Sequence, residues 1–262
     1  ATTITVDATV ATGNTITMNI GGSLLTLGGF GAIATVAGNT LNIKSGTYTI
    51  TSATANVAGG CFSKTSNITI EGYGTNYGDR GTPPLLQASG ISTFTMVLMT
   101  TTSGAVVRNV NFDGASLTSS RAVNIRGLVD TVSAVNCTNT ALVITSGSMV
   151  NCIVSGCTGT AYSGGGSYYA CVAHTNAGRG FNIGTNSGVS RCISYSNTGA
   201  NGIGFDNSNG EGVIFSNCVA YANAQQGFRN ADEGCTYINC IAEDNTGIGF
   251  EFRASFSDFV VN

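Results

Sequence analysis

The chain has 262 residues, with 37 Gly, 2 Pro, no Trp and 9% charged residues, against roughly 25% charged in an average globular protein. A net charge of -3 and ten scattered Lys and Arg residues leave no basic patch, which argues against a nucleic-acid partner. The 42% hydrophobic content argues against a disordered polar tract. The uncharged stretch at residues 8–43 is interrupted by Asn and Gly, which argues against membrane insertion.

The N-terminal part predicts short strands separated by glycine turns. Residues 1–38 are expected to form an N-terminal cap and the first strands, and residues 39–250 a parallel β-helix. Period-two alternation predicts strands at 40–44, 46–50 and 67–74, and the series continues at 106–112 and 122–125. The start at Ala1 is compatible with removal of an initiator Met or with signal-peptide cleavage. We favour the first.

The most irregular stretch runs from Tyr73 to Ala88 and contains Tyr77, Asp79, Arg80 and the two prolines, Pro83 and Pro84. Proline and glycine in this density predict a loop. Two interpretations remain open: a plain insertion between strands, or a protruding loop that carries contacts on a rigid scaffold.

Cysteines mark a repeat in the C-terminal half. Successive cysteines are 15, 19, 21, 26 and 22 residues apart in the series Cys137, Cys152, Cys171, Cys192, Cys218 and Cys240. Fixed short strands with variable connections are typical of a β-helix whose insertions fall in loops. The total of nine cysteines is odd, so we expect a ladder of buried reduced thiols that suits folding in the cytosol. Disulfides in a secreted protein are the alternative.

Two further columns follow the last four cysteines of this series. Each strand after the cysteine is apolar at both alternating positions, which predicts burial on both faces, and ends at Asn176, Asn197, Asn223 or Asn245. These amides are expected to stack as a ladder. Next comes a Gly-Phe pair, at residues 180–181, 204–205, 227–228 and 249–250. The glycines are expected to supply positive φ angles, and the phenylalanines an interior stack.

The last segment, residues 251–262, is expected to be a capping or subunit-contact strand. Phe250, Phe252 and Phe256 share one face by alternation. An open β-helix end must be covered, either by this tail capping its own coil or by pairing with another subunit. We favour the subunit contact. At about 22 residues per turn, the whole chain would make about ten to twelve rungs.

A family resemblance adds to this reading. Residues 39–48, followed by 68–74, resemble the opening rungs of the pectin-lyase-like β-helix superfamily, and most of all the non-catalytic or tailspike-like β-helices of tailed bacteriophages. The resemblance implies an all-β, single-domain, right-handed parallel β-helix that associates side by side as a homotrimer. It specifies fold better than activity.

Carboxylates are the first candidates for the polysaccharide chemistry of this superfamily. Hydrolysis requires two carboxyl groups about 5 to 9.5 Å apart. The candidates are Asp206, Glu211, Asp232, Glu233, Glu243 and Asp244. The alternative, which we favour, is that these are solvated loop charges that keep the solenoid soluble.

Metal-dependent chemistry receives less support from the sequence. A calcium cage needs converging oxygen ligands, and Asp7, Asp79, Asp113 and Asp130 are too scattered to form one. Arg179, Arg191 and Arg229 would act as lyase bases only beside such a metal. His174 shares a column with Tyr195, Tyr221 and Glu243, which predicts an exposed stacking position. Cys152 and Cys157 lie five residues apart and lack the spacing of a zinc site. We therefore predict no catalytic, cofactor-binding or metal-binding residues.

These observations favour a non-enzymatic structural protein of a phage virion, either capsid decoration or a small spike. The expected partners are two further copies of the chain and other virion proteins such as a capsid shell or tail, with a cell-surface glycan as a further candidate. Assembly would occur in the host cytoplasm, with secretion as the alternative. The competing hypothesis is a polysaccharide-degrading lyase or glycoside hydrolase, as a tailspike or a secreted enzyme.

Overall fold

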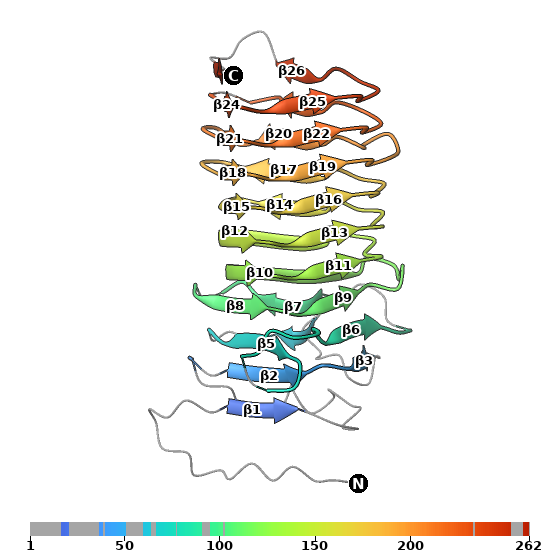
Figure 1. Ribbon diagram of the computed structural model, residues 1–262, viewed down its shortest axis with the longest axis vertical. Coiled ribbons are helices and arrows are strands. Elements are labelled where there is room, and N and C mark those ends of the chain that lie inside the picture. The colour runs from blue at the N-terminus through green and yellow to red at the C-terminus, as the bar shows by residue number, and fades with distance from the viewer. Residues whose placement is uncertain are drawn as a thin grey trace.

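The protein is a coil of parallel strands (Figure 1). The computed structural model describes residues 17–20, 37–38, 40–50, 60–63, 67–76, 78–90, 95–101, 103–232, 234–252 and 259–261. All regular elements in these ranges are strands, and strands of successive turns pair in parallel. No helix long and apolar enough to cross a membrane occurs among them. The predicted right-handed parallel β-helix is confirmed.

One face of the coil is a sheet of nine strands, one from each successive turn. It contains β3 (Thr47–Ile50), β6 (Leu85–Ala88), β9 (Asn111–Asp113), β11 (Ser133–Val135), β13 (Ile153–Ser155), β16 (Val172–His174), β19 (Ile193–Tyr195), β22 (Val219–Tyr221) and β25 (Ile241–Glu243). Within the described residues, nine turns have a strand in this sheet, a count that differs modestly from the ten to twelve rungs expected.

The other sheet has 18 strands and supplies the remaining two faces of the coil. The long strands β10 and β12 join these two faces, because each pairs with two separate strands of a neighbouring turn. One face contains β4 (Gly60–Ser63), β7 (Thr95–Met99), β14 (Tyr162–Gly164), β17 (Phe181–Gly184), β20 (Phe205–Asn209), β23 (Phe228–Asn230) and β26 (Phe250–Phe252). The other contains β1 (Thr17–Ile20), β2 (Thr40–Lys44), β5 (Thr69–Tyr73), β8 (Ala105–Arg108), β15 (Ser167–Tyr169), β18 (Gly188–Ser190), β21 (Ile214–Ser216), β24 (Thr236–Ile238) and β27 (Phe259–Val261). The joining strands are β10 (Arg121–Asp130) and β12 (Leu142–Val150).

The predicted N-terminal strands at 40–44, 46–50 and 67–74 correspond to β2, β3 and β5. Residues 106–112 form two strands, β8 and β9, because Asn109 turns the backbone between them with a φ of 53°. Residues 122–125 belong to the longer β10. Most of the expected cap, residues 1–38, lies outside the described residues, and so does Phe256 in the tail. Of the tail, β27 pairs with β24 and continues the coil.

The interior contains the expected ladders. Amide Nδ2 donates to the Oδ1 of the next turn at 3.0 Å from Asn176 to Asn197, at 2.9 Å from Asn197 to Asn223 and at 2.9 Å from Asn223 to Asn245. A second ladder stacks aromatic rings 4.5 to 4.8 Å apart through Tyr162, Phe181, Phe205, Phe228 and Phe250. The eight cysteines whose side chains the structure describes are buried thiols.

The predicted register of Cys137 is wrong. Strand β11 pairs with β13 so that Val135 lies beside Ser155, which aligns Cys137 with Cys157 rather than with Cys152. The backbone N–H of Cys137 accordingly lies 3.3 Å from the Cys157 sulfur. The 15-residue step to Cys152 therefore joined two different columns.

The predicted reason for the glycine of each Gly-Phe pair is also wrong. None of the four has a positive φ; that conformation is adopted instead by the residues just before each cysteine and each ladder asparagine, such as Arg191 and Ser196. A Cβ atom on Gly180 would lie 2.0 Å from Ser194 Oγ and 3.2 Å from Ala173 Cβ. Glycine is therefore needed because the opposite sheet approaches too closely for a side chain.

Candidate functional site

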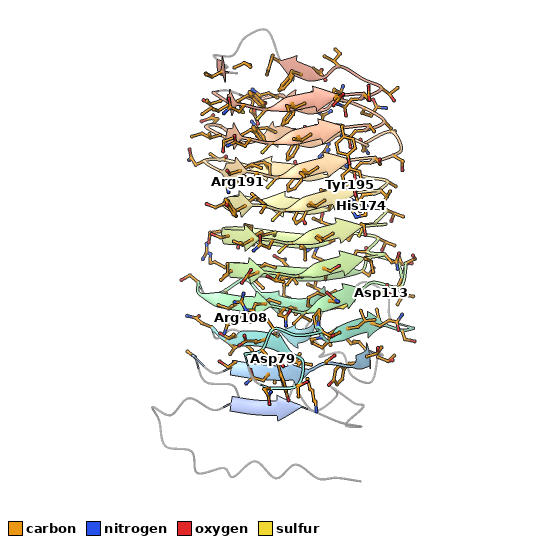
Figure 2. All side chains as sticks on the ribbon, in the orientation of Figure 1. Asp79, Arg108, Asp113, His174, Arg191 and Tyr195 are labelled. Carbon is orange, nitrogen blue, oxygen red and sulfur yellow. The ribbon has the colours of Figure 1, made fainter. Side chains whose placement is uncertain are left out.

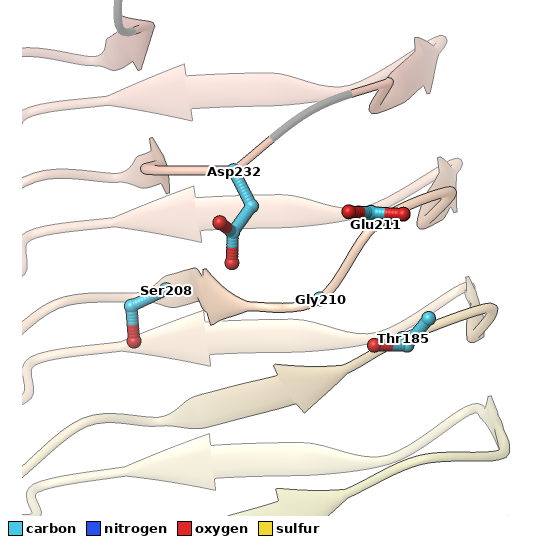
Figure 3. Close-up of a pocket in the computed structure, with 5 residues that line it drawn as sticks. All are labelled: Thr185, Ser208, Gly210, Glu211 and Asp232. Atoms are coloured by element: carbon cyan, nitrogen blue, oxygen red, sulfur yellow. The ribbon is translucent and has the colours of Figure 1, made fainter.

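A polar groove of about 480 Å³ crosses the loops that follow β17, β20 and β23. Its lining residues are Thr185, Ser208, Gly210, Glu211 and Asp232. Figure 3 shows Ser208, Gly210 and Glu211 along one turn, with Asp232 on the next turn and Thr185 on the turn before. The groove thus presents two carboxylates and two hydroxyls on one face of the coil.

A buried ion cluster lies next to this groove. Asp206, on β20, has a fully buried side chain and accepts two hydrogen bonds from Arg229 on β23, at 2.7 Å and 2.8 Å. Arg179 approaches the same carboxylate from the turn before β17, with its Nε 2.8 Å from Oδ2. The hydrogen-bonded carboxylate raises the pKa of the Arg229 guanidinium above its usual value. Ser208 of the groove donates to Asp206 Oδ2 at 3.2 Å, which links the two features.

The structure therefore brings together only some of the predicted carboxylates. Glu211 and Asp232 line one groove, whereas Asp206 is held by the two arginines. Glu243 ends β25 in the nine-stranded sheet, and Asp244 forms the turn that follows with a φ of 51°. Glu233 lies outside the described residues.

Asp79 anchors the irregular loop between β5 and β6. Its exposed carboxylate accepts backbone N–H groups from Gly74, Thr75, Asn76 and Gly81 at 2.6 to 3.0 Å. These donors hold the pKa of Asp79 well below its usual range, because they stabilise the charged form. The loop is shorter than the predicted stretch of residues 73–88, because residues 85–88 form strand β6. Tyr77 lies outside the described residues.

The other carboxylates that the sequence analysis considered too scattered for a calcium site are Asp7, Asp113 and Asp130. Asp113 accepts hydrogen bonds from Gln87, Ala115 and Asn136. Asp130 pairs with Arg80 at 3.3 Å. Asp7 lies outside the described residues, and within the described ranges no three His, Cys, Asp or Glu residues converge on a common point.

The predicted column of His174 is confirmed. Its imidazole stacks on the Tyr195 ring at 4.9 Å, and Tyr195 stacks on Tyr221 at 4.8 Å. Figure 2 shows His174 and Tyr195 one above the other at the edge of the coil. Arg191 lies on another part of the surface, where it donates to the Tyr169 hydroxyl at 2.7 Å.

Beside this aromatic column runs a column of exposed aliphatic side chains that the sequence interpretation missed. We expect the strands after the last four cysteines to be buried on both faces, but Ile241 is 54% exposed. Ile153, at the same position of an earlier turn, is 45% exposed. The inner face of these strands carries the small buried residues Val154, Ala173 and Ala220 instead. In the sequence, this column is visible as an Ile or Val directly after Cys152, Cys171, Cys192, Cys218 and Cys240.

Comparisons with known proteins support the fold. No family model and no curated protein matches the chain. A solved rhamnogalacturonan lyase aligns at a TM-score of 0.63 with 16% identity, over 78% of this chain and 66% of that one. The AlgE4 A-module, a mannuronan C-5 epimerase from Azotobacter vinelandii, aligns at 0.58 with 14% identity, over 81% and 65%. ORF18 of Geobacillus virus E2 aligns more weakly, at 0.46 with 12% identity, over 89% and 56%, and adds no support to the fold.

These similarities are at the level of fold. The chain is similar to right-handed parallel β-helix proteins of the pectin-lyase type, and it spans just under two thirds of the length of the lyase and the epimerase module.

Proposed function

We propose that the protein is a non-enzymatic structural component of a virion surface, either capsid decoration or a small spike, assembled as a homotrimer. The observation that carries the proposal is that the repeated polar and reactive side chains are engaged in ladders between turns. The Asn176 to Asn245 amides bond to one another, and the cysteines pack in the interior. Such ladders stiffen a rod, because each turn is hydrogen-bonded and packed on the next.

The virion assignment is supported by the sequence resemblance of residues 39–48 and 68–74 to phage β-helices. The buried free thiols support folding in a reducing cytoplasm, because disulfides form mainly in oxidising compartments. A trimer fits the low net charge of -3, since identical chains at this charge repel one another weakly.

The proposal is tested by measuring the mass of the native protein and by imaging the particle that contains it. We expect three times the chain mass in light scattering, and density for three parallel rods at the particle surface. A protein that stays monomeric at all concentrations, with no particle that contains it, would contradict the proposal.

A second function is favoured by one specific observation: Glu211 and Asp232 line one groove. Two carboxyl groups on either side of the scissile bond are the usual catalytic groups of glycoside hydrolases. The test is incubation with acidic and neutral polysaccharides, with and without calcium, followed by detection of released oligosaccharides or unsaturated sugars. Product that is lost in Glu211→Gln and in Asp232→Asn, but kept in the Glu243→Gln control on another face, would establish this enzyme and overturn the structural role.

A further inference from the structure

The outer face of the nine-stranded sheet carries an uninterrupted apolar stripe. One column of the stripe contains Ile153, Val172, Ile193, Val219 and Ile241, which lie in register from turn to turn. The second column contains His174, Tyr195 and Tyr221, two positions further along each strand. We call these eight residues the outer stripe.

The outer stripe is accessible and almost free of charge. Ile153, Tyr221 and Ile241 are 45%, 37% and 54% exposed, and the other five are half-buried. Its one titratable group besides the tyrosines is His174, and the nearest carboxylate in register is Glu243 at its C-terminal margin. A contiguous apolar surface on a soluble protein marks an interaction site more often than isolated exposed residues do.

The arrangement of the rings favours a protein partner over a sugar. The rings of the aromatic column are nearly parallel, with interplanar angles of 10° and 2°. Their π faces therefore cover one another, and only the ring edges point outward. A saccharide stacks on an open ring face, whereas the edges and methyl groups of the outer stripe suit close packing against apolar side chains.

The period of the outer stripe matches the period of a second copy of the chain. Its side chains recur once per turn, at about 4.8 Å along the coil axis. A second coil of the same chain repeats its own side chains at that spacing, so a contact made at one turn recurs at every turn. In a cyclic trimer of parallel copies, the same face of every copy points toward the axis, so the outer stripes of three copies can meet there.

We propose that the outer stripe is the surface through which copies of this chain associate side by side. The inference rests on the proposed function for the existence of the assembly, and it adds the face that holds the assembly together. It replaces the tail at residues 251–262 as the main subunit contact.

The test compares matched substitutions on two faces. Ile153→Asp places a charge in the outer stripe, and Ile214→Asp places one on β21 of the other sheet, where the side chain is similarly exposed at 50%. We expect Ile153→Asp to weaken association at least tenfold in sedimentation or light scattering. We expect Ile214→Asp to keep the wild-type mass, with circular dichroism confirming that both variants are folded.

A second measurement does not depend on how the charged variants fold. A photo-cross-linking phenylalanine derivative replaces Tyr221 in the outer stripe or Tyr169 on β15, which are 37% and 41% exposed. Irradiation is expected to give covalent dimers and trimers from position 221 and none from position 169.

The outcomes separate this inference from the proposed function. An oligomer that survives Ile153→Asp and cross-links through position 169 instead of 221 would rule out the outer stripe as the contact surface, while the proposed assembly itself would stand. A wild-type protein that is monomeric at every concentration would overturn both.

Discussion

Each interior asparagine uses both ends of its amide, so the ladder depends on every member. Asn197 accepts from the backbone N–H and the Nδ2 of Asn176, and it donates to Asn223 and Ser194. Asn197→Ala would leave the two N–H groups of Asn176 buried without an acceptor. Each orphaned group costs about 1 to 3 kcal/mol, so we expect the free energy of unfolding to fall by about 3 kcal/mol.

Urea denaturation followed by circular dichroism measures this loss. The matched control is Asn201→Ala, because Asn201 lies in an exposed turn and such changes usually stay within about 0.5 kcal/mol. Equal midpoints for the two variants would show that the ladder contributes no more than a surface amide.

At the scale of elements, the spacing between the faces is set where the glycines of the Gly-Phe pairs meet the small residues of the nine-stranded sheet. A Cβ on Gly204 would lie 2.5 Å from the Gly227 carbonyl oxygen and 3.0 Å from Ala220 Cβ. Because backbone atoms of the next turn cannot move aside independently, we expect Gly204→Ala to destabilise the coil by more than about 2 kcal/mol.

Gly188→Ala is the control for this prediction. A Cβ there meets no atom within 4 Å, and the residue has no positive φ. Reduced entropy of the unfolded chain should make it neutral or stabilising by up to about 1 kcal/mol. Thermal melting of both variants checks the pair, and an equal shift in melting temperature would show that close approach is not why Gly204 is glycine.

The elements also show how far the sequence predicts this protein. The turns from Cys171 to Asn245 were predictable, because each column repeats one residue type and a parallel coil stacks like on like. Cys137 was misplaced, because cysteine occupies two columns and residue type alone does not distinguish them. The groove with Glu211 and Asp232 was not predictable as a unit, since it depends on how loops of unequal length bend. The outer stripe was visible as Ile and Val, but hydrophobicity does not reveal which face lacks a covering layer.

At the scale of the whole molecule, the reactivity of the buried cysteines can be used to measure how the coil opens. Cys152, Cys171, Cys192, Cys218 and Cys240 lie in register from turn to turn along the coil. Cys152, Cys171, Cys192 and Cys218 are fully buried, so an alkylating reagent cannot reach these thiols in the closed coil. Alkylation therefore requires the coil to open first.

A solenoid is held together by contacts between neighbouring turns, so opening should spread from an end. Cys240 lies in the turn of β25, close to the C-terminal end of the coil, and is already 4% exposed, whereas Cys218, Cys192 and Cys171 are fully buried. In low urea we expect iodoacetamide to label Cys240 first, then Cys218, Cys192 and Cys171 in that order, as measured by peptide mass spectrometry over time. The variant Ile214→Cys, at a position that is 50% exposed and lies outside the outer stripe, provides an exposed thiol that should react at once without urea. Simultaneous labelling of all four cysteines would contradict this order and show that the coil opens as one cooperative unit. The stacked amides and rings would then couple neighbouring turns too strongly for the end of the coil to open separately.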